Sequence, residues 1–271
     1  MKKELGKGTV IVEMDERGVV TATLNRPEVN NAYNGDMLSG LHQALDILAD
    51  AGEARVLVLK GQGKHFQAGA DLAWISSVGK TGPNGNLEAS RVTAEAVRRL
   101  NQLPLPTVVM VQGGCFGGGT GIVSACDVVI AADTALFAIT EARWGLMAGI
   151  ILPQLCHAMG VRHVRRYALT CERFGASVAK EIGLVHEVCH ESELQALAGK
   201  VIDALLMNGP AAVMATKLRT LDVSGSLIGD GLFDELVAEH AMTRQSAEAA
   251  EGTASFLEKR LPKWYPGKGK L

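Results

Sequence analysis

The sequence predicts an α/β core followed by a wholly helical C-terminal region. Short runs of β-branched residues alternate with segments whose apolar residues recur every three or four positions. Each later strand runs into a loop rich in glycine, and from about residue 191 only helical periodicity remains. No linker or low-complexity tract interrupts the chain, so we expect a core over residues 1–190 and a helical region over residues 191–271.

The first elements are an antiparallel hairpin and a helix. Residues 9–14 and 19–24 are rich in β-branched side chains and are separated by a short polar turn that ends in Gly18. Asn34 then stands where a helix cap is expected, because an apolar face follows it at helical spacing, formed by Leu38, Leu41, Leu45 and Leu48.

The later elements follow the same alternation. Buried strands are predicted at residues 55–59, 107–111, 127–131 and 135–139, with a second helix at about residues 88–102. Residues 81–86 combine glycine, proline and asparagine and therefore predict a mobile loop. The C-terminal region predicts four helices, at residues 194–207, 211–221, 232–246 and 252–261.

Composition excludes several classes of partner. The chain has 271 residues, of which 47% are hydrophobic and 21% charged, values typical of a globular protein. Its net charge of −2 provides no basic field for nucleic acid or anionic lipid. The cysteines are odd in number and form no C-x-x-C pair, which predicts reduced thiols in a cytoplasmic protein: Cys115, Cys126, Cys156, Cys171 and Cys189.

No membrane segment or secretion signal is expected either. The first residues contain lysines but no apolar stretch behind them. Residues 105–126 lack any charge, yet they contain Pro106, Gln112 and six glycines, which argues against a continuous membrane helix. A buried strand that passes through a glycine turn into a helix explains this segment better.

Three segments contain candidate functional residues. Residues 65–72 follow a buried strand, and the small residues around Gly69 allow a ligand to approach the backbone, although a simple tight turn is the better explanation of this segment alone. Residues 113–121 form a glycine-rich entry to a helix, whose free amides suit an oxyanion or a phosphate. The motifs G-x-G-x-x-G, G-x-x-x-x-G-K-[ST] and G-x-S-x-G are missing, which disfavours nucleotide binding and serine hydrolysis. Glu141 follows the last strand and would alone be read as a surface residue.

The order and spacing of these segments resemble the enoyl-CoA hydratase/isomerase (crotonase) family. The motif F-x-A-G-A-D-L is followed by a glycine triplet centred on Gly118, and Glu141 comes 23 positions after Gly118. An early L-N-R-P and a late E-G-x-x-x-F-L-E-K-R extend the resemblance over nearly the whole chain. The resemblance implies a spiral of repeated β-β-α units, with a C-terminal helical region that assembles subunits into trimers or hexamers.

The resemblance also implies roles for individual residues. The amides of Ala70 and Gly118 would bind the thioester oxygen of an acyl-CoA, and Glu141 would exchange protons at its C2–C3 double bond. The carbonyl of Ala68 would contact the adenine of coenzyme A, and substrate contacts are further expected from Gly69, Asp71, Leu72 and Gly121. Coenzyme A is then part of the substrate, and neither a metal nor another cofactor is expected. A CoA phosphate would meet Lys259 or Arg260, unless these tail charges are merely solvated.

The chain departs from the family at Gly121, where two-glutamate hydratases have their other acid. Three readings stay open: a hydratase with altered water activation, an isomerase that uses Glu141 alone, and a noncatalytic acyl-CoA binder. We favour the hydratase, because A-G-A-D-L-A-W and F-G-G-G-x-G-I-V-S-A-C-D resemble bacterial hydratases of 3-branched glutaconyl-CoA esters. That group includes methylglutaconyl-CoA and isohexenylglutaconyl-CoA hydratases, of leucine and acyclic-terpene breakdown. The space at Gly121 would then receive the branch at C3 or a water, and Arg143 would hold the distal carboxylate or remain solvated.

Overall fold

A seven-stranded sheet lies at the centre of the computed structural model, which describes residues 2–267 except for the side chain of residue 50. The order of its strands is β1-β2-β3-β4-β5-β7-β10. Strands β1 to β3 pair antiparallel, which confirms the predicted hairpin, and the pairs from β3 to β10 are parallel. The strands are β1 (Lys2–Leu5), β2 (Val10–Met14), β3 (Val19–Leu24), β4 (Val56–Gly61), β5 (Thr107–Val111), β7 (Val128–Ala132) and β10 (Glu187–Cys189).

A second sheet stacks successive turns of the chain on one another. It contains β6 (Gly114–Phe116), β8 (Leu136–Ala138) and β9 (Phe174–Gly175). Strand β6 pairs parallel with β8, and single parallel bridges join Tyr33 to Ala70 and Gln67 to Cys115. The turns that pair in parallel therefore lie side by side in the same direction, which produces a spiral, while β9 pairs antiparallel with β8. Strand β6 was not predicted, because its three residues belong to the glycine-rich run.

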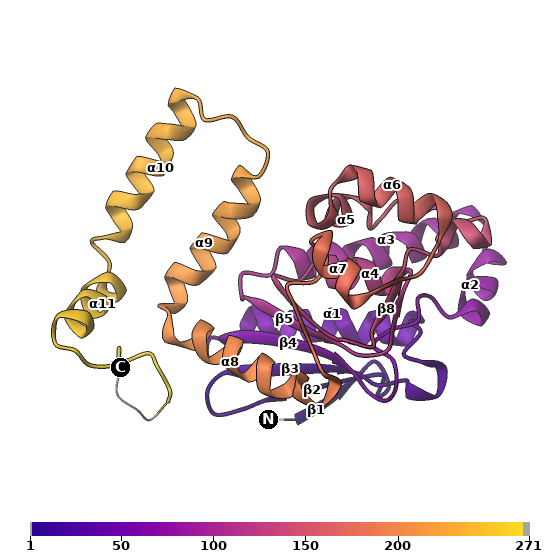
Figure 1. Cartoon of the computed structure of the whole chain (residues 1–271), viewed down its shortest axis with the longest axis horizontal. Helices are drawn as coiled ribbons and strands as arrows, with labels where there is room; N and C mark the ends of the chain where they lie inside the picture. The colour runs from indigo at the N-terminus through magenta and orange to yellow at the C-terminus, as the bar shows by residue number, and fades with distance from the viewer. Residues whose placement is uncertain (1, 268–271) are drawn as a thin grey trace.

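Helices cover both faces of the large sheet. Residues 56–59 of β4 and all of β5 are buried, so that neither face of these central strands meets water. Helix α8 packs on β4, β5 and β7, while α1 packs against α3 and the first two strands (Figure 1). The helices of this part are α1 (Gly35–Asp50), α2 (Leu72–Gly79), α3 (Gly82–Asn101), α4 (Gly118–Ser124), α5 (Leu152–Met159), α6 (Val161–Thr170), α7 (Ala176–Glu181) and α8 (Leu194–Met207).

The start of α1 confirms the predicted helix cap, whereas the start of α3 lies where a loop was predicted. Asn34 caps α1 as expected, since its side-chain oxygen accepts a hydrogen bond from the amide of Met37 at 3.0 Å. The loop expected at residues 81–86 is instead the beginning of α3. Pro83 stands in the first turn, where its missing N–H costs nothing, and the Asn86 side chain donates to the carbonyl of Gly82 at 2.8 Å.

The last three helices extend away from the sheets (Figure 1). They are α9 (Pro210–Val223), α10 (Asp230–Thr243) and α11 (Ala247–Leu257), so α11 begins five residues before the predicted position. The division at residue 190 stays a prediction, and α8, which lies beyond it, packs on the large sheet. Within residues 2–267, no single helix is long and apolar enough to span a membrane; α8 with its preceding turn and α9 meet that criterion only as a pair bent by 104°.

Candidate active site

Two loops present backbone amides that have no acceptor. The N–H of Tyr33 donates to the carbonyl of Gly69, and the N–H of Asp71 donates to the carbonyl of Tyr33, each at 2.9 Å. These two bonds leave the amide of Ala70 between them unused. Gly118 is the first residue of α4, whose opening amides have no partner within the helix. Among the described residues, neither the Ala70 amide nor the Gly118 amide donates a hydrogen bond.

The buried side chain of Gln67 fixes the first of these loops. Its Oε1 accepts from the amide of Gly69 at 2.8 Å, and its Nε2 donates to the carbonyl of the same residue at 3.0 Å. Gly69 has φ +90°, and a Cβ there would lie 3.3 Å from the carbonyl oxygen of Phe116. A glycine is therefore needed for both the turn and the close contact with the second loop. Gln67 was not predicted, because no local pattern in the sequence indicates a side chain that bonds its own loop.

Asp71 holds the end of the same loop and does not line the pocket, contrary to the expected substrate contact. Its carboxylate caps α2 by accepting from the amides of Ala73 and Trp74, and it pairs with Arg26 at 3.0 Å. Burial alone would raise the pKa of Asp71, but hydrogen bonds from Arg26 and the two amides outweigh it and lower that pKa below its ordinary value. Leu72, the next residue, does line the pocket.

Glu141 stands at the first position of a short 3-10 helix, η2 (Glu141–Trp144), which begins three residues after the end of β8. Its Oε1 would lie 3.1 Å from a Cβ at Gly117, so the carboxylate packs beside the second loop. Its Oε2 is buried and has no hydrogen-bond partner among the described residues. Burial raises the pKa of Glu141, and the backbone amides of Glu141 and Thr140 oppose that rise only in part. Such a carboxylate is suited to take up and return a proton.

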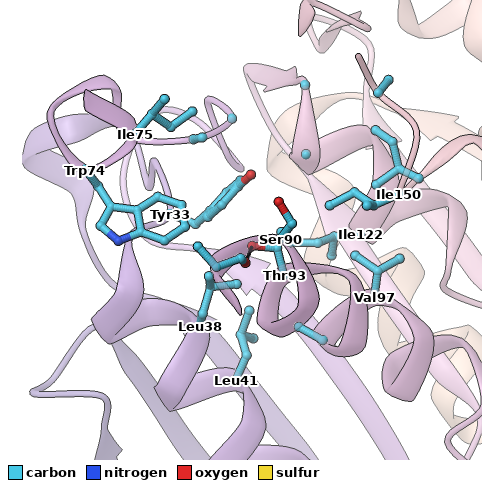
Figure 2. A pocket seen from close by; sticks show the side chains of 18 of the residues that line it. Tyr33, Leu38, Leu41, Trp74, Ile75, Ser90, Thr93, Val97, Ile122 and Ile150 are labelled. Carbon is cyan, nitrogen blue, oxygen red and sulfur yellow. Dashed lines mark hydrogen bonds between the residues drawn. The ribbon is translucent and has the colours of Figure 1, made fainter. Parts of the chain in front are cut away.

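Both residues with free amides, and Glu141 with them, line one pocket of about 400 Å³. Ala68, Gly69, Ala70, Gly118 and Glu141 line it together, so the structure unites these predicted residues. Glu141 is the only charged side chain among its described lining residues. The inner part is apolar. Figure 2 shows Leu38 and Leu41 of α1 and Val97 of α3 in its wall. The lining also includes Leu57 and Leu59 of β4 and Leu100 of α3.

Gly121 does not open space for a substrate, which corrects the expected substrate contact. It is buried in α4 and does not line the pocket. A Cβ at this position would lie 2.8 Å from the Cβ of Ile151 and closer still to one of its methyl carbons. The volume that the family's glutamate would fill is therefore taken up by Ile151, the residue that precedes α5.

Tyr33 lines the pocket and was not predicted as a site residue. Its ring meets Trp74 edge to face, with ring centroids 5.7 Å apart. Burial, and next the negative charge of Glu141, raise the pKa of Tyr33 to about 12. The phenol therefore stays protonated at neutral pH. A tyrosine before a helix cap carries no local signal of function, and only the bridge to Ala70 brings it to the site.

Three basic residues that were considered for substrate binding lie elsewhere. Arg143 is exposed, donates to the carbonyl of Cys171 at 2.9 Å and does not line the pocket. Arg260 pairs with Glu251 at 2.6 Å and also with Glu258, so its charge is already matched within the chain. Lys259 is exposed and forms no ion pair with any described residue.

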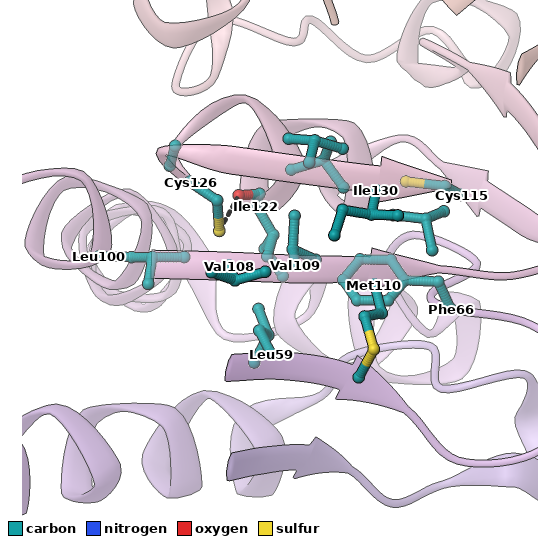
Figure 3. Close-up of a cluster of buried hydrophobic side chains, with 14 of the residues drawn as sticks. Leu59, Phe66, Leu100, Val108, Val109, Met110, Cys115, Ile122, Cys126 and Ile130 are labelled. Carbon is teal, nitrogen blue, oxygen red and sulfur yellow. Dashed lines mark hydrogen bonds between the residues drawn. The ribbon is translucent and has the colours of Figure 1, made fainter. Parts of the chain in front are cut away.

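The buried cluster beneath the site makes its loops rigid. Phe66 and Cys115, which immediately precede or begin the two amide-bearing loops, are completely buried beside Met110 and Ile130 (Figure 3). Ile122 of α4 belongs to the same cluster and also lines the pocket. Because close-packed interiors resist displacement, the two free amides are held at a fixed separation.

Two free amides and a half-buried carboxylate that meet in an apolar pocket are the groups that stabilisation of an oxyanion beside a proton transfer requires. The sequence model of the enoyl-CoA hydratase/isomerase family matches residues 14–267. The chain belongs to this family.

Individual relatives agree over most of the chain. It is 34% identical over 212 residues to the hydroxycinnamoyl-CoA hydratase-lyase of Pseudomonas fluorescens, covering 77% of this chain and 76% of that protein. It is 31% identical to the enoyl-CoA hydratase EchA19 of Mycobacterium tuberculosis, covering 92% and 94%. The crystal structure of an enoyl-CoA hydratase from Shewanella pealeana superimposes with a TM-score of 0.90 at 34% identity, covering 94% of this chain and 96% of that one. These likenesses confirm the crotonase-type fold.

Proposed function

We propose that this chain adds water across the C2–C3 double bond of an enoyl-CoA thioester. The observation that carries the proposal is the meeting of the free Ala70 and Gly118 amides with the half-buried Glu141 carboxylate in one pocket. The names of the relatives from Pseudomonas fluorescens and Mycobacterium tuberculosis, both hydratases, support it. The coenzyme A enters as part of the substrate, and we propose no separate cofactor and a cytoplasmic location.

The reaction uses the three groups in sequence. Glu141 takes a proton from water while the water oxygen bonds to C3, and the electron pair of the double bond moves toward the thioester oxygen. The two amides stabilise the negative charge that collects there, and losing one such donor typically costs about 3–4 kcal/mol of barrier. Glu141, now protonated, delivers its proton to C2, which releases a 3-hydroxyacyl thioester and restores the carboxylate.

The isomerase reading uses the same groups without water, since one carboxylate can carry a proton between C2 and C4. The noncatalytic reading gives no reason for an unpartnered carboxylate oxygen in the pocket, because a buried unsatisfied group costs stability. We therefore place hydration first and isomerisation second.

The substrate class that we propose is an ester branched at C3, of the glutaconyl-CoA type. The apolar walls of the pocket support an ester whose branch is a long hydrocarbon, as in isohexenylglutaconyl-CoA, over one that carries only a methyl branch. The second carboxylate of such esters finds no cation among the described lining residues, so it would have to face solvent at the mouth of the pocket. An apolar enoyl-CoA without this carboxylate is the competing substrate.

Turnover of a substrate panel tests these proposals. Crotonyl-CoA, a linear 2-decenoyl-CoA, 3-methylglutaconyl-CoA and isohexenylglutaconyl-CoA would be incubated with the protein, and both hydration and double-bond migration followed. We expect hydration, with the highest kcat/KM for the ester with the long apolar branch. Migration without hydration would establish the isomerase instead, and preference for the linear ester would remove the branched class.

A further inference from the structure

The phenol of Tyr33 lines the pocket, and the hydration steps described above do not use it. Its backbone bridges to Ala70, and a Cβ at Gly118 would lie 2.7 Å from its Cε1. Tyr33 therefore touches both residues whose amides face the thioester oxygen. In Figure 2 its hydroxyl points into the open space of the pocket. That hydroxyl makes no hydrogen bond to any residue in the described part of the chain.

Glu141 approaches the same place from the other side. Its Oε1 packs against Gly117, whereas the Tyr33 ring packs against Gly118. Consecutive α-carbons are only about 3.8 Å apart, so the two side chains flank a single peptide unit. The negative charge of Glu141 also contributes to the raised pKa of Tyr33, as expected for neighbouring groups. Glu141 and Tyr33 thus line one cavity, and neither Glu141 Oε2 nor the Tyr33 hydroxyl has a hydrogen-bond partner among the described residues.

We propose that the Tyr33 hydroxyl and the Glu141 carboxylate together hold the attacking water, so that Tyr33 replaces the second acid that is missing at Gly121. This inference rests on the proposed hydratase function. One hydrogen of the water is donated to Glu141 and the other to the phenol oxygen, which directs the remaining lone pair toward C3. Polar sites with two or more partners are the ones that retain ordered water.

The division of labour between the two groups follows from their protonation. The pKa of Tyr33, raised to about 12 by burial and by the charge of Glu141, keeps the phenol neutral throughout. Tyr33 therefore orients the water and gives up no proton, while Glu141 alone carries the proton from the water to C2. The water oxygen thus bonds to C3 with one of its hydrogens, and its other hydrogen reaches C2 through Glu141. Hydration therefore needs only one titrating acid and one neutral hydroxyl.

Tyr33→Phe is the decisive variant, because it keeps the ring that packs on Gly118 and Trp74 and removes only the hydroxyl. We expect kcat for hydration to fall by about tenfold to a hundredfold, since a misplaced reactant costs on this order. The Kd for the matching saturated acyl-CoA should stay within about threefold of wild type. Tyr167→Phe is the matched control, because Tyr167 is buried in the core away from the pocket, and it should retain wild-type kcat.

The outcomes separate this inference from the function on which it rests. If the wild-type protein hydrates no ester of the panel, the hydratase proposal fails. If it does, and Tyr33→Phe retains kcat within about threefold, the role of Tyr33 alone is refuted. A loss of kcat matched by an equal loss of affinity would also refute it, because a packing role affects both. Tyr33→His, which keeps a polar ring atom, should retain more hydration than Tyr33→Phe and gives a second comparison if the phenylalanine variant folds poorly.

Discussion

Glu141 combines two properties that rarely occur together in a structural residue: a buried oxygen without a partner and a pKa raised by that burial. Replacing it with Gln keeps the shape and removes the proton transfer. We expect Glu141→Gln to lower kcat by at least about a hundredfold, the usual scale of acid–base catalysis. Affinity for a saturated acyl-CoA, measured by calorimetry, should change little. Retention of more than about a tenth of kcat would rule out the assigned role.

The same burial predicts how stability depends on pH. The raised pKa means that folded protein binds the Glu141 proton more tightly than the unfolded chain does. Ionised Glu141 therefore costs stability, and this cost appears as the pH rises from the unfolded pKa, about 4.3, through the higher folded value. Glu141→Gln should raise Tm at pH 7 relative to wild type, and the difference should shrink toward pH 4. Equal Tm differences at both pH values would contradict the burial argument.

Because Ile151 packs against Gly121, we expect a larger side chain at this position to destabilise the fold. A glutamate there would collide with Ile151, so Gly121→Glu should reduce the free energy of unfolding by roughly 1–3 kcal/mol or more through overpacking. Activity on a branched and on a straight ester should fall alike, because the pocket is disturbed as a whole. The double variant Gly121→Glu with Ile151→Ala should recover stability relative to Gly121→Glu. Loss on the branched ester alone would show that Gly121 lies beside the branch after all.

Among individual residues, those with free backbone amides and the single acid could be predicted from the sequence. The side chains that support them could not. Ala70, Gly118 and Glu141 were identified because their spacing resembles a family pattern, and the structure brings them into one pocket. Gln67, Tyr33 and Ile151 could not be identified in this way. Their roles depend on contacts between segments far apart in the chain, which single-sequence patterns do not contain.

Among the elements, α2 depends on one carboxylate that serves both its cap and the preceding loop. Asp71 caps the helix and pairs with Arg26, and their side chains are only 19% and 15% exposed. Asp71→Ala loses both interactions and should reduce the free energy of unfolding by roughly 2–4 kcal/mol. Asp71→Asn keeps the cap and should lose less, about 1–3 kcal/mol, by leaving Arg26 without its charge partner.

The same pair of variants tests the link to catalysis. The amide of Ala70 directly precedes Asp71, so loosening the loop displaces one of the two donors. We expect kcat/KM for hydration to fall by about tenfold or more in Asp71→Ala and by less in Asp71→Asn. Urea unfolding together with steady-state kinetics measures both effects. Full activity in Asp71→Ala would show that α4 and Gly118 suffice to hold the oxyanion.

Element prediction was most reliable where periodicity is strong and weakest where glycine and proline are common. The hairpin, α1 and β5 were confirmed, because β-branched runs and a leucine face leave one interpretation. Residues 82–86 were misread because the same residue types that form loops also begin helices. Strand β6 has three residues and is defined by its pairing with β8 and by the bridge from Cys115 to Gln67, which the sequence alone cannot show.

At the scale of the whole molecule, the last two helices expose large apolar side chains that the core does not cover. Helix α10 contains no buried residue, although it presents Phe233 and Val237 at 57% and 52% exposure. Phe256 and Leu257 of α11 are 79% and 74% exposed. Arg219 of α9 pairs with Glu235 and Glu239 of α10, so the two helices are tied together while their apolar residues remain uncovered. Because exposed apolar surface on this scale is typical of interaction sites, we expect this face to bind a partner.

A second and third copy of the chain are the partners that this surface predicts, giving the trimer or hexamer that we expect in solution. Placing a charge in the middle of the patch should separate the subunits, because a desolvated, unpaired carboxylate is costly at an interface. We expect Val237→Asp to sediment as a smaller species than wild type at micromolar concentration. Leu169→Asp changes an equally apolar residue on α6, 75% exposed and outside the patch, and should leave the assembly intact.

The activity of the Val237→Asp variant shows whether catalysis depends on subunit assembly. None of the described pocket-lining residues lies beyond residue 151, so each subunit contains its own amides and carboxylate. A separated Val237→Asp subunit should therefore retain the Glu141-dependent chemistry unless coenzyme A is held across the interface, in which case KM rises while kcat is preserved. A wild-type protein that sediments as a monomer would refute the assembly and leave the exposed face of α10 and α11 without its predicted partner.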